Sequence, residues 1–296
     1  MFASFIPIGL YTSFFLNPKL MWFVIALVIM FITGLIDDII HIGFKRKLIG
    51  LLLAICIVVF IGEIQLKSLG NLLAFGNIRL GVLTIPFTII AIFGVTNAIN
   101  LIDGLDGLAS GIGIIALSAF TFFAFLGGNY SLVIVSLALI GSLIGFLIYN
   151  FYPASIFMGD SGSLFLGFCL SIIAIILTQN SHQVTQPIIP VTILALPIFD
   201  TLWVMGKRIL CKENPFIADK NHIHHNLLKL GLSHKQTVYL LWGLTGFLSL
   251  FAVSFHYFPS YLLFYIILTF CCVFWSLIEY FLWKRGSVEG LKSKKS

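Results

Sequence analysis

The stretch "NAINLIDGLDGLASG", residues 97–111, decides how this chain folds and where its chemistry lies. It follows an apolar run, residues 83–95, that is typical of a membrane span. Charged groups in or beside a membrane span are costly, so their presence indicates a functional site at the end of a membrane helix. Four polar side chains follow one another here: Asn97, Asn100, Asp103 and Asp106.

The composition is that of a membrane protein with many spans. Of the 296 residues, 59% are hydrophobic and 9% are charged, whereas a soluble domain carries about 25% charged residues. We therefore expect one all-α domain over residues 1–296, a polytopic integral membrane helix bundle surrounded by the lipid bilayer. The net charge of +6 is then explained by membrane topology, and no nucleic acid partner is expected. The five cysteines lack metal-type spacing and are interpreted as mostly small apolar fillers.

Ten apolar runs predict about ten transmembrane helices, because a bilayer span needs about 20 residues and fewer where neighbouring helices bury its ends. Between the third and fourth runs, residues 64–81 contain glycines and asparagines that predict a small extracytoplasmic hairpin. The ten runs are 2–16, 20–36, 48–63, 83–99, 108–126, 131–149, 162–178, 187–205, 237–256 and 260–282.

The basic residues give the orientation. When the loops are assigned alternately to the two sides of the membrane, all of the 17 basic residues except Lys19, Lys67 and Arg79 fall on one side. The positive-inside rule makes that side cytoplasmic, and both termini lie there. The carboxylates and histidines that end the runs fall on the same side, so segments far apart in sequence are predicted to form one cytoplasmic site. They are Asp37, Asp38, Asp103, Asp106, Asp160, Asp200, His222, His224 and His225.

Two pairs of carboxylates end the second and fourth runs. Asp37 and Asp38 close "GLIDD", residues 34–38, and adjacent helical residues point about 100° apart, so each could serve a different partner. A hard cation such as Mg²⁺ is one such partner, and a solvated acid pair is the alternative. Asp103 and Asp106 share a face if they are helical, whereas an ordinary Asp-Gly turn is the alternative.

Two further carboxylates lie at the ends of apolar runs. Asp160 stands in "FMGDSGSLFLG", residues 157–167, where it could simply cap the following helix. The free amides of that helix N-terminus could also help to hold a phosphate, in which case Asp160 would need a bridging cation beside the anion. Asp200 ends the eighth run within "PIFD" and could form a structural ion pair with Lys207 or Arg208.

The segment "NPFIADKNHIHHNLLKLG", residues 214–231, carries three histidines. If the segment is helical, His222 and His225 share a face and His224 points away. These histidines, beside the basic residues Lys220 and Arg208, would suit pyrophosphate oxygens by hydrogen bond and charge. Zinc is the alternative, although no cysteine or acid completes a convincing ligand set nearby.

These ingredients favour phosphoryl transfer at the membrane surface. Such catalysis consists mainly of positioning and charge neutralisation, which carboxylates with a hard cation, anion-binding amides and basic residues can supply. A transporter is the competing class. It would usually place its polar groups near the bilayer midplane, on broken helices or inverted repeats, whereas here they crowd at one end.

Five motifs in order resemble the polyprenyl-phosphate N-acetylhexosamine-1-phosphate transferases. They are "GLIDD", "NAINLIDGLDGLASG", "FMGDSGSLFLG", "PIFD" and "NPFIADKNHIHHNLLKLG", and the resemblance covers about residues 30–235. This family includes the phospho-MurNAc-pentapeptide translocase and the GlcNAc-1-phosphate transferases that start O-antigen and teichoic acid chains. The "HIHH" form looks more like the GlcNAc-1-phosphate branch.

The resemblance implies a reaction at a bacterial plasma membrane. A UDP-N-acetylhexosamine and undecaprenyl phosphate would give an undecaprenyl-diphosphate sugar and UMP, with Mg²⁺ or Mn²⁺ as cofactor. GlcNAc-1-phosphate is the expected group, and the product would start a cell-envelope glycan of the O-antigen, enterobacterial common antigen or teichoic acid type. FucNAc, QuiNAc and MurNAc-pentapeptide donors are the alternatives, and a homodimer is the implied assembly.

The family's functional positions carry over by matching motif. Asp37 and Asp38 would lie near the lipid phosphate and the metal, one of them as base or nucleophile, and Asp160 and Asp38 would be Mg²⁺ ligands. Phe157 matches a position that packs against uracil. The remaining matched positions lie in the nucleotide site (Asn97, Asp103 and, nearby, Asp106), at the diphosphate or sugar (His222, His224 and His225) or at basic sites (Lys47 and Arg208).

One departure from the family concerns the start of the chain. Members normally begin with another span and a cytoplasmic "D-x-P-x-x-R-x-x-H" stretch, whereas this sequence starts with "MFASFIPIGLY". We therefore expect ten spans where the GlcNAc branch usually has eleven. Reduced but measurable activity is expected, because the basic stretch would add positive charge around the diphosphate.

Overall fold

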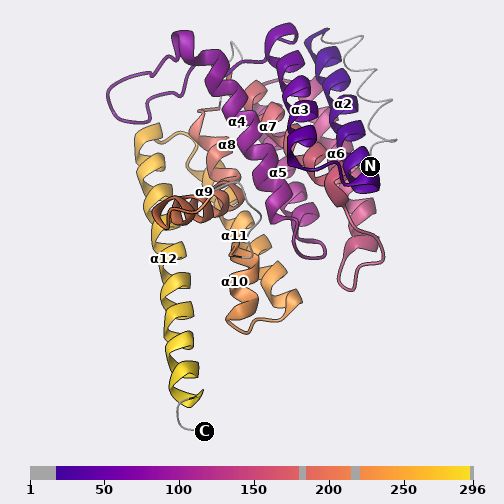
Figure 1. Ribbon diagram of the computed structural model, residues 1–296. Helices are drawn as coiled ribbons and strands as arrows, with labels where there is room; N and C mark the ends of the chain where they lie inside the picture. Colours follow the sequence, from indigo (N-terminus) through magenta and orange to yellow (C-terminus); the bar gives the residue numbers. More distant parts are fainter. Residues whose placement is uncertain (1–17, 180–184, 215–220, 294–296) are drawn as a thin grey trace.

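The computed structural model describes residues 18–179, 185–214 and 221–293, and over these ranges the chain forms helices and no extended sheet (Figure 1). A π-helical turn, Ile57–Ile61, follows α3, and a 3₁₀ turn, Gly81–Leu83, precedes α4. The α-helices are α2 (Pro18–Ile40), α3 (Phe44–Cys56), α4 (Thr84–Ile102), α5 (Leu108–Leu126), α6 (Tyr130–Asn150), α7 (Gly159–Gln179), α8 (Ile188–Ile193), α9 (Ala195–Leu210), α10 (Ile223–Lys229), α11 (His234–Ser254) and α12 (Ser260–Ser293).

Seven helices in the described ranges are long and apolar enough to cross a membrane: α2, α4, α5, α6, α7, α11 and α12. The predicted multi-pass helix bundle is therefore confirmed, while the count differs from ten. The run 2–16 lies outside the described residues. The run 48–63 forms α3 with its π-helical turn, which together are shorter than the other spans.

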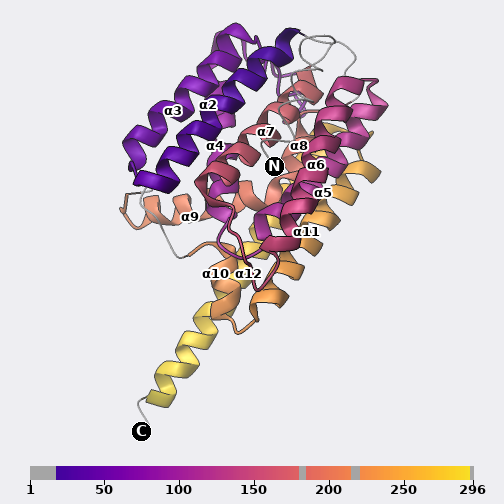
Figure 2. The same ribbon diagram turned by 90° about the vertical axis from the view of Figure 1, so that its right-hand side faces the viewer.

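The run 187–205 is not one span, because it divides into α8 and α9. Pro197 explains the break, since a proline has no N–H to donate to residue 193 and its ring clashes with that carbonyl. The chain bends at Leu194, which leaves the helical conformation with φ −94° and ψ 14°. As a result α9 runs across the neighbouring helices rather than along them (Figures 1 and 2).

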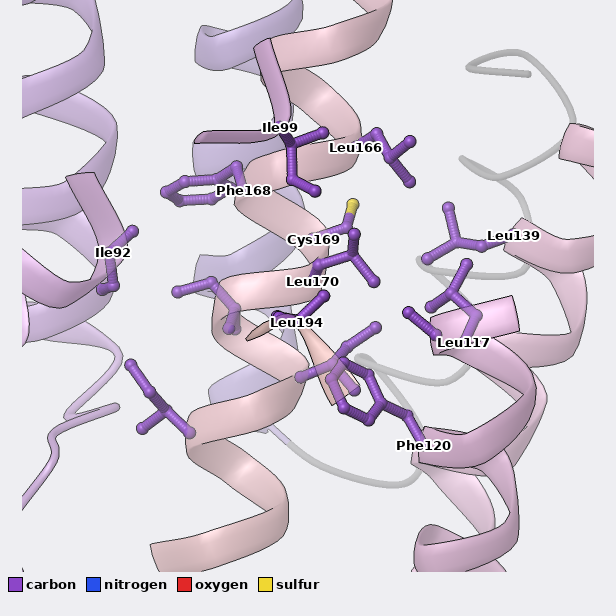
Figure 3. Close-up of a cluster of buried hydrophobic side chains, with 14 of the residues drawn as sticks. Ile92, Ile99, Leu117, Phe120, Leu139, Leu166, Phe168, Cys169, Leu170 and Leu194 are labelled. Atoms are coloured by element: carbon purple, nitrogen blue, oxygen red, sulfur yellow. The ribbon is translucent and has the colours of Figure 1, made fainter. Parts of the chain in front are cut away.

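The centre of the bundle is α7, which packs between α2 and α4. Its apolar side chains meet those of α4, α5 and α6 in one buried cluster (Figure 3). Lipid tails are as apolar as these side chains, so close van der Waals packing holds the helices together. Members of the cluster include Leu166, Phe168, Cys169 and Leu170 of α7, Ile92 and Ile99 of α4, Leu117 and Phe120 of α5, and Leu139 of α6.

Two glycines let the backbones around α7 approach closely. A Cβ atom on Gly34 of α2 would lie 2.4 Å from Cα of Ser161 in α7. A Cβ atom on Gly167 of α7 would lie 2.8 Å from Cα of Thr96 in α4. Small residues at membrane helix crossings permit this kind of contact. The first crossing sets the end of α2 beside the start of α7, where the predicted site lies.

The hairpin predicted over residues 64–81 is present. Leu69 N–H donates to the carbonyl of Ile78, and Leu80 N–H donates to that of Lys67, each at 3.0 Å. Gln179 of α7 anchors the hairpin, since its Oε1 accepts from Lys67 N–H at 3.0 Å. The hairpin lies at the end of the bundle opposite α10 and the loops that follow α4 and α6 (Figure 1).

The α2–α7 crossing predicts the effect of a larger residue at Gly34. Gly34→Val forces its side chain into the α7 backbone and should lower the free energy of unfolding by about 1–3 kcal/mol or more. Gly141→Val is the matched control, because a Cβ atom at Gly141 of α6 has no heavy atom within 4 Å. Thermal unfolding in detergent measures both variants. Equal midpoints would contradict the close contact.

Candidate active site

An ion cluster joins three helices at the end of the bundle that also holds α10. Asp37 comes from the last turn of α2, Lys47 from the first turn of α3 and Asp160 from the first turn of α7. Lys47 Nζ donates to Oδ2 of Asp160 and lies 3.4 Å from Oδ2 of Asp37. All three side chains are largely shielded from solvent. Two carboxylates thus converge on one positive group, as the sequence predicted for segments far apart in the chain.

Asn100 of α4 completes this cluster. Its Nδ2 donates to Oδ1 of Asp160 and to Oγ of Ser163, each at 2.8 Å. The sequence drew attention to Asn100 but assigned the nucleotide site to Asn97, one turn earlier on α4. Asn97 is not among the described residues that line the cavity beside Asp160. Its assignment stays a prediction, whereas the contact of Asn100 with Asp160 was missed.

Asp38 has different neighbours from Asp37. Its Oδ1 accepts from the backbone N–H of Asp160 at 2.8 Å, and its Oδ2 accepts from that of Ser161 at 3.0 Å. The hypothesis that Asp160 caps its own helix is therefore wrong, because α2 supplies the cap. These two amides are also engaged, so they are not the free phosphate-binding amides that the sequence suggested.

A cavity of about 330 Å³ opens beside the ion cluster. The loops that follow α4 and α6 form it together with the ends of α4, α6 and α7. Phe157 lies in its wall with 76% of its surface exposed, so the ring is free to stack on a flat ligand. The lining residues are Asn100, Asp103, Gly104, Leu105, Asp106, Asn150, Phe157, Met158, Gly159, Asp160 and Ser163.

Asp103 and Asp106 both line this cavity but differ in their surroundings. Burial, together with the charges of Asp160 and Asp106, raises the pKa of Asp103 to about 7. Asp106 instead accepts from the backbone N–H of Ala154 at 3.1 Å. It therefore holds the loop before α7 against the loop after α4, in addition to facing the cavity.

Asn150 is a structural residue of this cavity that the sequence analysis missed. It is buried at the end of α6, where its Oδ1 accepts from Gly107 N–H at 3.0 Å and from Ser110 Oγ at 3.1 Å. Its Nδ2 donates to the carbonyl of Ile156 at 3.0 Å. An asparagine that ends an apolar run two residues before an aromatic–proline pair was the available signal.

The three histidines lie at the start of α10, but their faces differ from the prediction. His222 is the N-cap and has an extended backbone, so helical spacing does not apply to it. Its ring stacks parallel to that of His224 at 6.1 Å between centroids, and the ring of His225 lies 4.2 Å from His224. The prediction that His222 and His225 share one face of a helix while His224 points away from it is therefore wrong.

His224 faces the cavity wall. A Cβ atom on Gly104 would lie 2.1 Å from its Nε2, so only glycine fits at that position. The ring is buried, and neither of its nitrogens has a hydrogen-bond partner among the described residues. Burial lowers the pKa of His224 to about 3, with the neighbouring His225 and His222 adding to the effect. The ring is therefore neutral at pH 7 and could serve a ligand as a neutral hydrogen-bonding group.

Asp200 pairs with His222, so the predicted pairing with Lys207 or Arg208 is wrong. Its Oδ2 lies 2.8 Å from His222 Nδ1, and its Oδ1 accepts from Ile223 N–H at 2.8 Å. Lys207 instead pairs with Glu279 of α12 at 2.7 Å. The reason is the direction of α9: its last turn, which carries Lys207 and Arg208, leads away from Asp200 in its first half.

Arg208 lies in the last turn of α9 and does not line the cavity in the described part of the chain. It donates to the carbonyl of Asn214 at 3.0 Å. Its role at a basic binding position stays a prediction. Lys220, the other basic residue near the histidines, lies outside the described residues.

The donors of the ion cluster fit a hard cation. Among the described residues, no three His, Cys, Asp or Glu side chains come together as a metal site. The carboxylates of Asp37 and Asp160, however, already converge on the positive Nζ of Lys47. Carboxylate oxygens are ligands that Mg²⁺ prefers, and it usually takes only one or two of them together with water and substrate phosphates.

A family model matches the half of the chain that supplies this cluster. The model for glycosyl transferase family 4 covers residues 20–178, which run from α2 through nearly all of α7. The chain belongs to glycosyl transferase family 4. The match includes all four residues of the ion cluster, Asp37, Lys47, Asn100 and Asp160, whereas α9 and the histidines of α10 lie beyond it.

Curated relatives cover more of the chain. It is 37% identical over 252 residues to a probable undecaprenyl-phosphate N-acetylglucosaminyl 1-phosphate transferase of Bacillus subtilis, which covers 85% of this chain and 68% of the relative. It is 31% identical to a decaprenyl-phosphate N-acetylglucosaminephosphotransferase of Mycolicibacterium smegmatis, over 75% of this chain and 59% of the relative. It is 29% identical to the undecaprenyl-phosphate alpha-N-acetylglucosaminyl 1-phosphate transferase of Escherichia coli K12, over 70% and 58%. The chain thus spans about three fifths to two thirds of the relatives it matches.

The raised pKa of Asp103 predicts a pH-dependent stability. The folded chain holds a proton at Asp103 up to about pH 7, whereas the unfolded chain releases it near pH 3.8. Stability from this group is therefore lost as the pH rises between these values. Asp103→Asn removes this titration. The melting temperature of the variant minus that of the wild type should therefore increase from pH 5 to 7 and stay constant at higher pH. Melting in EDTA measures this, and a constant difference would contradict it.

The buried contact of Asp200 with His222 predicts a second stability difference. Asp200→Asn removes the buried carboxylate that contacts His222 Nδ1 and Ile223 N–H and should cost roughly 1.5–3 kcal/mol of unfolding free energy. Lys207→Met breaks the exposed pair with Glu279 and should cost about 0–1 kcal/mol. Thermal unfolding of both variants in the same detergent compares them. An equal loss of unfolding free energy in Lys207→Met and Asp200→Asn would show that the contact between Asp200 and His222 contributes no more than the exposed pair.

Proposed function

We propose that this chain transfers N-acetylglucosamine 1-phosphate from UDP-N-acetylglucosamine to undecaprenyl phosphate and releases UMP. The observation that carries the proposal is the convergence of Asp37, Lys47, Asn100 and Asp160 beside a cavity at one end of a membrane bundle. The activities after which the relatives are named support the reaction. A membrane scaffold also suits a lipid acceptor whose phosphate must meet a water-soluble donor at the bilayer surface.

The reaction exchanges one phosphoric anhydride for another. An oxygen of the lipid phosphate forms a bond to the sugar-bearing phosphorus of the donor, and the bond from that phosphorus to the bridging oxygen breaks. UMP leaves with this oxygen. Charge accumulates on the phosphate oxygens throughout, so catalysis depends on positioning and neutralisation.

Each residue of the cluster has a role that its contacts support. Asp37 is the carboxylate of the adjacent pair that faces the cluster, which favours it for the proton of the lipid phosphate. Lys47 supplies a positive charge for phosphate oxygens, and Asn100 holds the Asp160 carboxylate. Asp37 and Asp160 would hold Mg²⁺ or Mn²⁺, a cation that neutralises the diphosphate and stabilises the departing UMP.

The cavity offers the matching features for a nucleotide. The exposed ring of Phe157 supports stacking on uracil, and Asp103 offers a carboxyl group on the same wall. The unpartnered nitrogens of His224 behind Gly104 suit the diphosphate or the sugar, as neutral donors or acceptors. The distribution of basic residues supports a cytoplasmic site with both termini in the cytoplasm of a bacterium.

Release of UMP from defined substrates tests the proposal. Purified chain in detergent with UDP-N-acetylglucosamine and undecaprenyl phosphate should release UMP, lose the activity in EDTA and regain it with Mg²⁺. Asp37→Asn and Asp160→Asn should lower turnover at least about 100-fold, because each removes charge that positions the phosphates. Glu279→Gln, which alters an exposed pair with Lys207 remote from the cavity, is the control and should retain turnover.

Two outcomes would contradict the proposal. Near-full turnover by the Asp160→Asn variant would show that the ion cluster takes no part in the reaction. Movement of UDP-sugar into vesicles without any UMP release would favour the transporter class instead. Competition among UDP-N-acetylhexosamines in the same assay identifies the sugar, and a comparison of undecaprenyl with decaprenyl phosphate identifies the acceptor.

A further inference from the structure

We infer that Asp38 is a positioning residue that caps α7 from outside and thereby fixes Asp160, while Asp37 alone of the adjacent pair faces the ion cluster. The inference rests on the proposed function only where it concerns the metal. Its basis is a set of contacts between the end of α2 and the first turn of α7.

The first turn of α7 lacks a cap of its own. The amides at a helix N-terminus have no intrahelical partner, and a local Ser, Thr, Asp or Asn side chain normally accepts from them. The three residues before Asp160 are Phe157, Met158 and Gly159, none of which carries a side-chain oxygen. Asp38 supplies both acceptors, at 2.8 Å for the amide of Asp160 and 3.0 Å for that of Ser161. Its negative charge also suits the positive end of the helix dipole.

Two glycines make room for this cap. Gly34, one helical turn before Asp38, brings the α2 backbone against Ser161. A Cβ atom on Gly159 would lie 2.7 Å from Oδ2 of Asp38, and Gly159 has φ +63°, a conformation that most side chains disfavour. The sequence of both helices is therefore adapted to place a carboxylate of α2 at the start of α7.

The cap acts on the residue that carries the cluster. Asp38 holds the backbone of Asp160, while Lys47 and Asn100 hold its side chain. The carboxylates of Asp37 and Asp38 point to different partners, because adjacent residues on a helix project about 100° apart. Loss of Asp38 should therefore displace Asp160 without removing any group that faces Lys47.

Amide hydrogen exchange in EDTA tests the cap without metal or substrate. Asp38→Ala should speed exchange at the amides of Asp160 and Ser161 by roughly fivefold, the expected effect of losing a helix cap. Asp37→Ala, the adjacent carboxylate with no contact to these amides among the described residues, should leave their exchange near that of the wild type. Unchanged exchange in Asp38→Ala would overturn the inference.

Binding of Mn²⁺, followed by electron paramagnetic resonance, separates positioning from direct ligation. Asp38→Ala should weaken binding, and the double variant Asp38→Ala with Gly159→Asn should restore it. The new side-chain amide enters the space that Asp38 leaves, its oxygen can accept from backbone amides although it carries no charge to bind a metal, and asparagine tolerates positive φ better than most residues. Restoration of both amide protection and Mn²⁺ affinity supports the inference. Restored protection without restored affinity would show that Asp38 itself binds the metal and would overturn it.

The two proposals fail separately. Absence of UMP release in the wild type would contradict the transferase reaction and leave the exchange result intact. Unchanged exchange in Asp38→Ala would contradict the cap while leaving the UMP assay unaffected.

Discussion

The contact between the end of α2 and the start of α7 is the constraint on which the site depends. Asp38 satisfies two amides that α7 cannot satisfy itself, and Gly34 allows the two backbones to meet. Exposed hydrogen bonds of this kind contribute little individually, about 0.5–1.5 kcal/mol each. Their importance lies in register, because a shift of α7 by one residue would carry Asp160 about 100° around the helix, away from Lys47 and Asn100.

Most carboxylates of the site are balanced by groups in direct contact with them. Lys47 contacts both Asp37 and Asp160 and offsets the repulsion between these neighbouring carboxyl groups, and the buried Asp200 contacts His222 and a backbone amide. Among the residues that the structure describes, Asp103 has no such partner, and its pKa is raised instead. Ionisable groups with perturbed pKa values cluster at functional sites, which agrees with the place of Asp103 in the cavity wall.

The sequence predicted the helical class and the gathering of carboxylates at one end, because hydropathy and the distribution of basic residues are strong signals in membrane proteins. It did not predict which carboxylate does what. Asp38, and not Asp160 as one interpretation of the sequence had it, caps α7, and this depends on contacts between helices that no local pattern encodes. The division into α8 and α9 at Pro197 was readable from the proline alone, whereas the extended backbone of His222 depends on its contact with Asp200.

The family match and the geometry answer different questions. The match shows descent and covers the helices that carry the ion cluster, but a motif's name assigns no physical role to its letters. In "GLIDD" the two aspartates are chemically identical, yet one faces an ammonium group and the other faces two backbone amides. A substitution at either position would impair the same reaction, for different reasons. Only measurements made without turnover, such as amide exchange, distinguish a carboxylate that reacts from one that holds its neighbour in place.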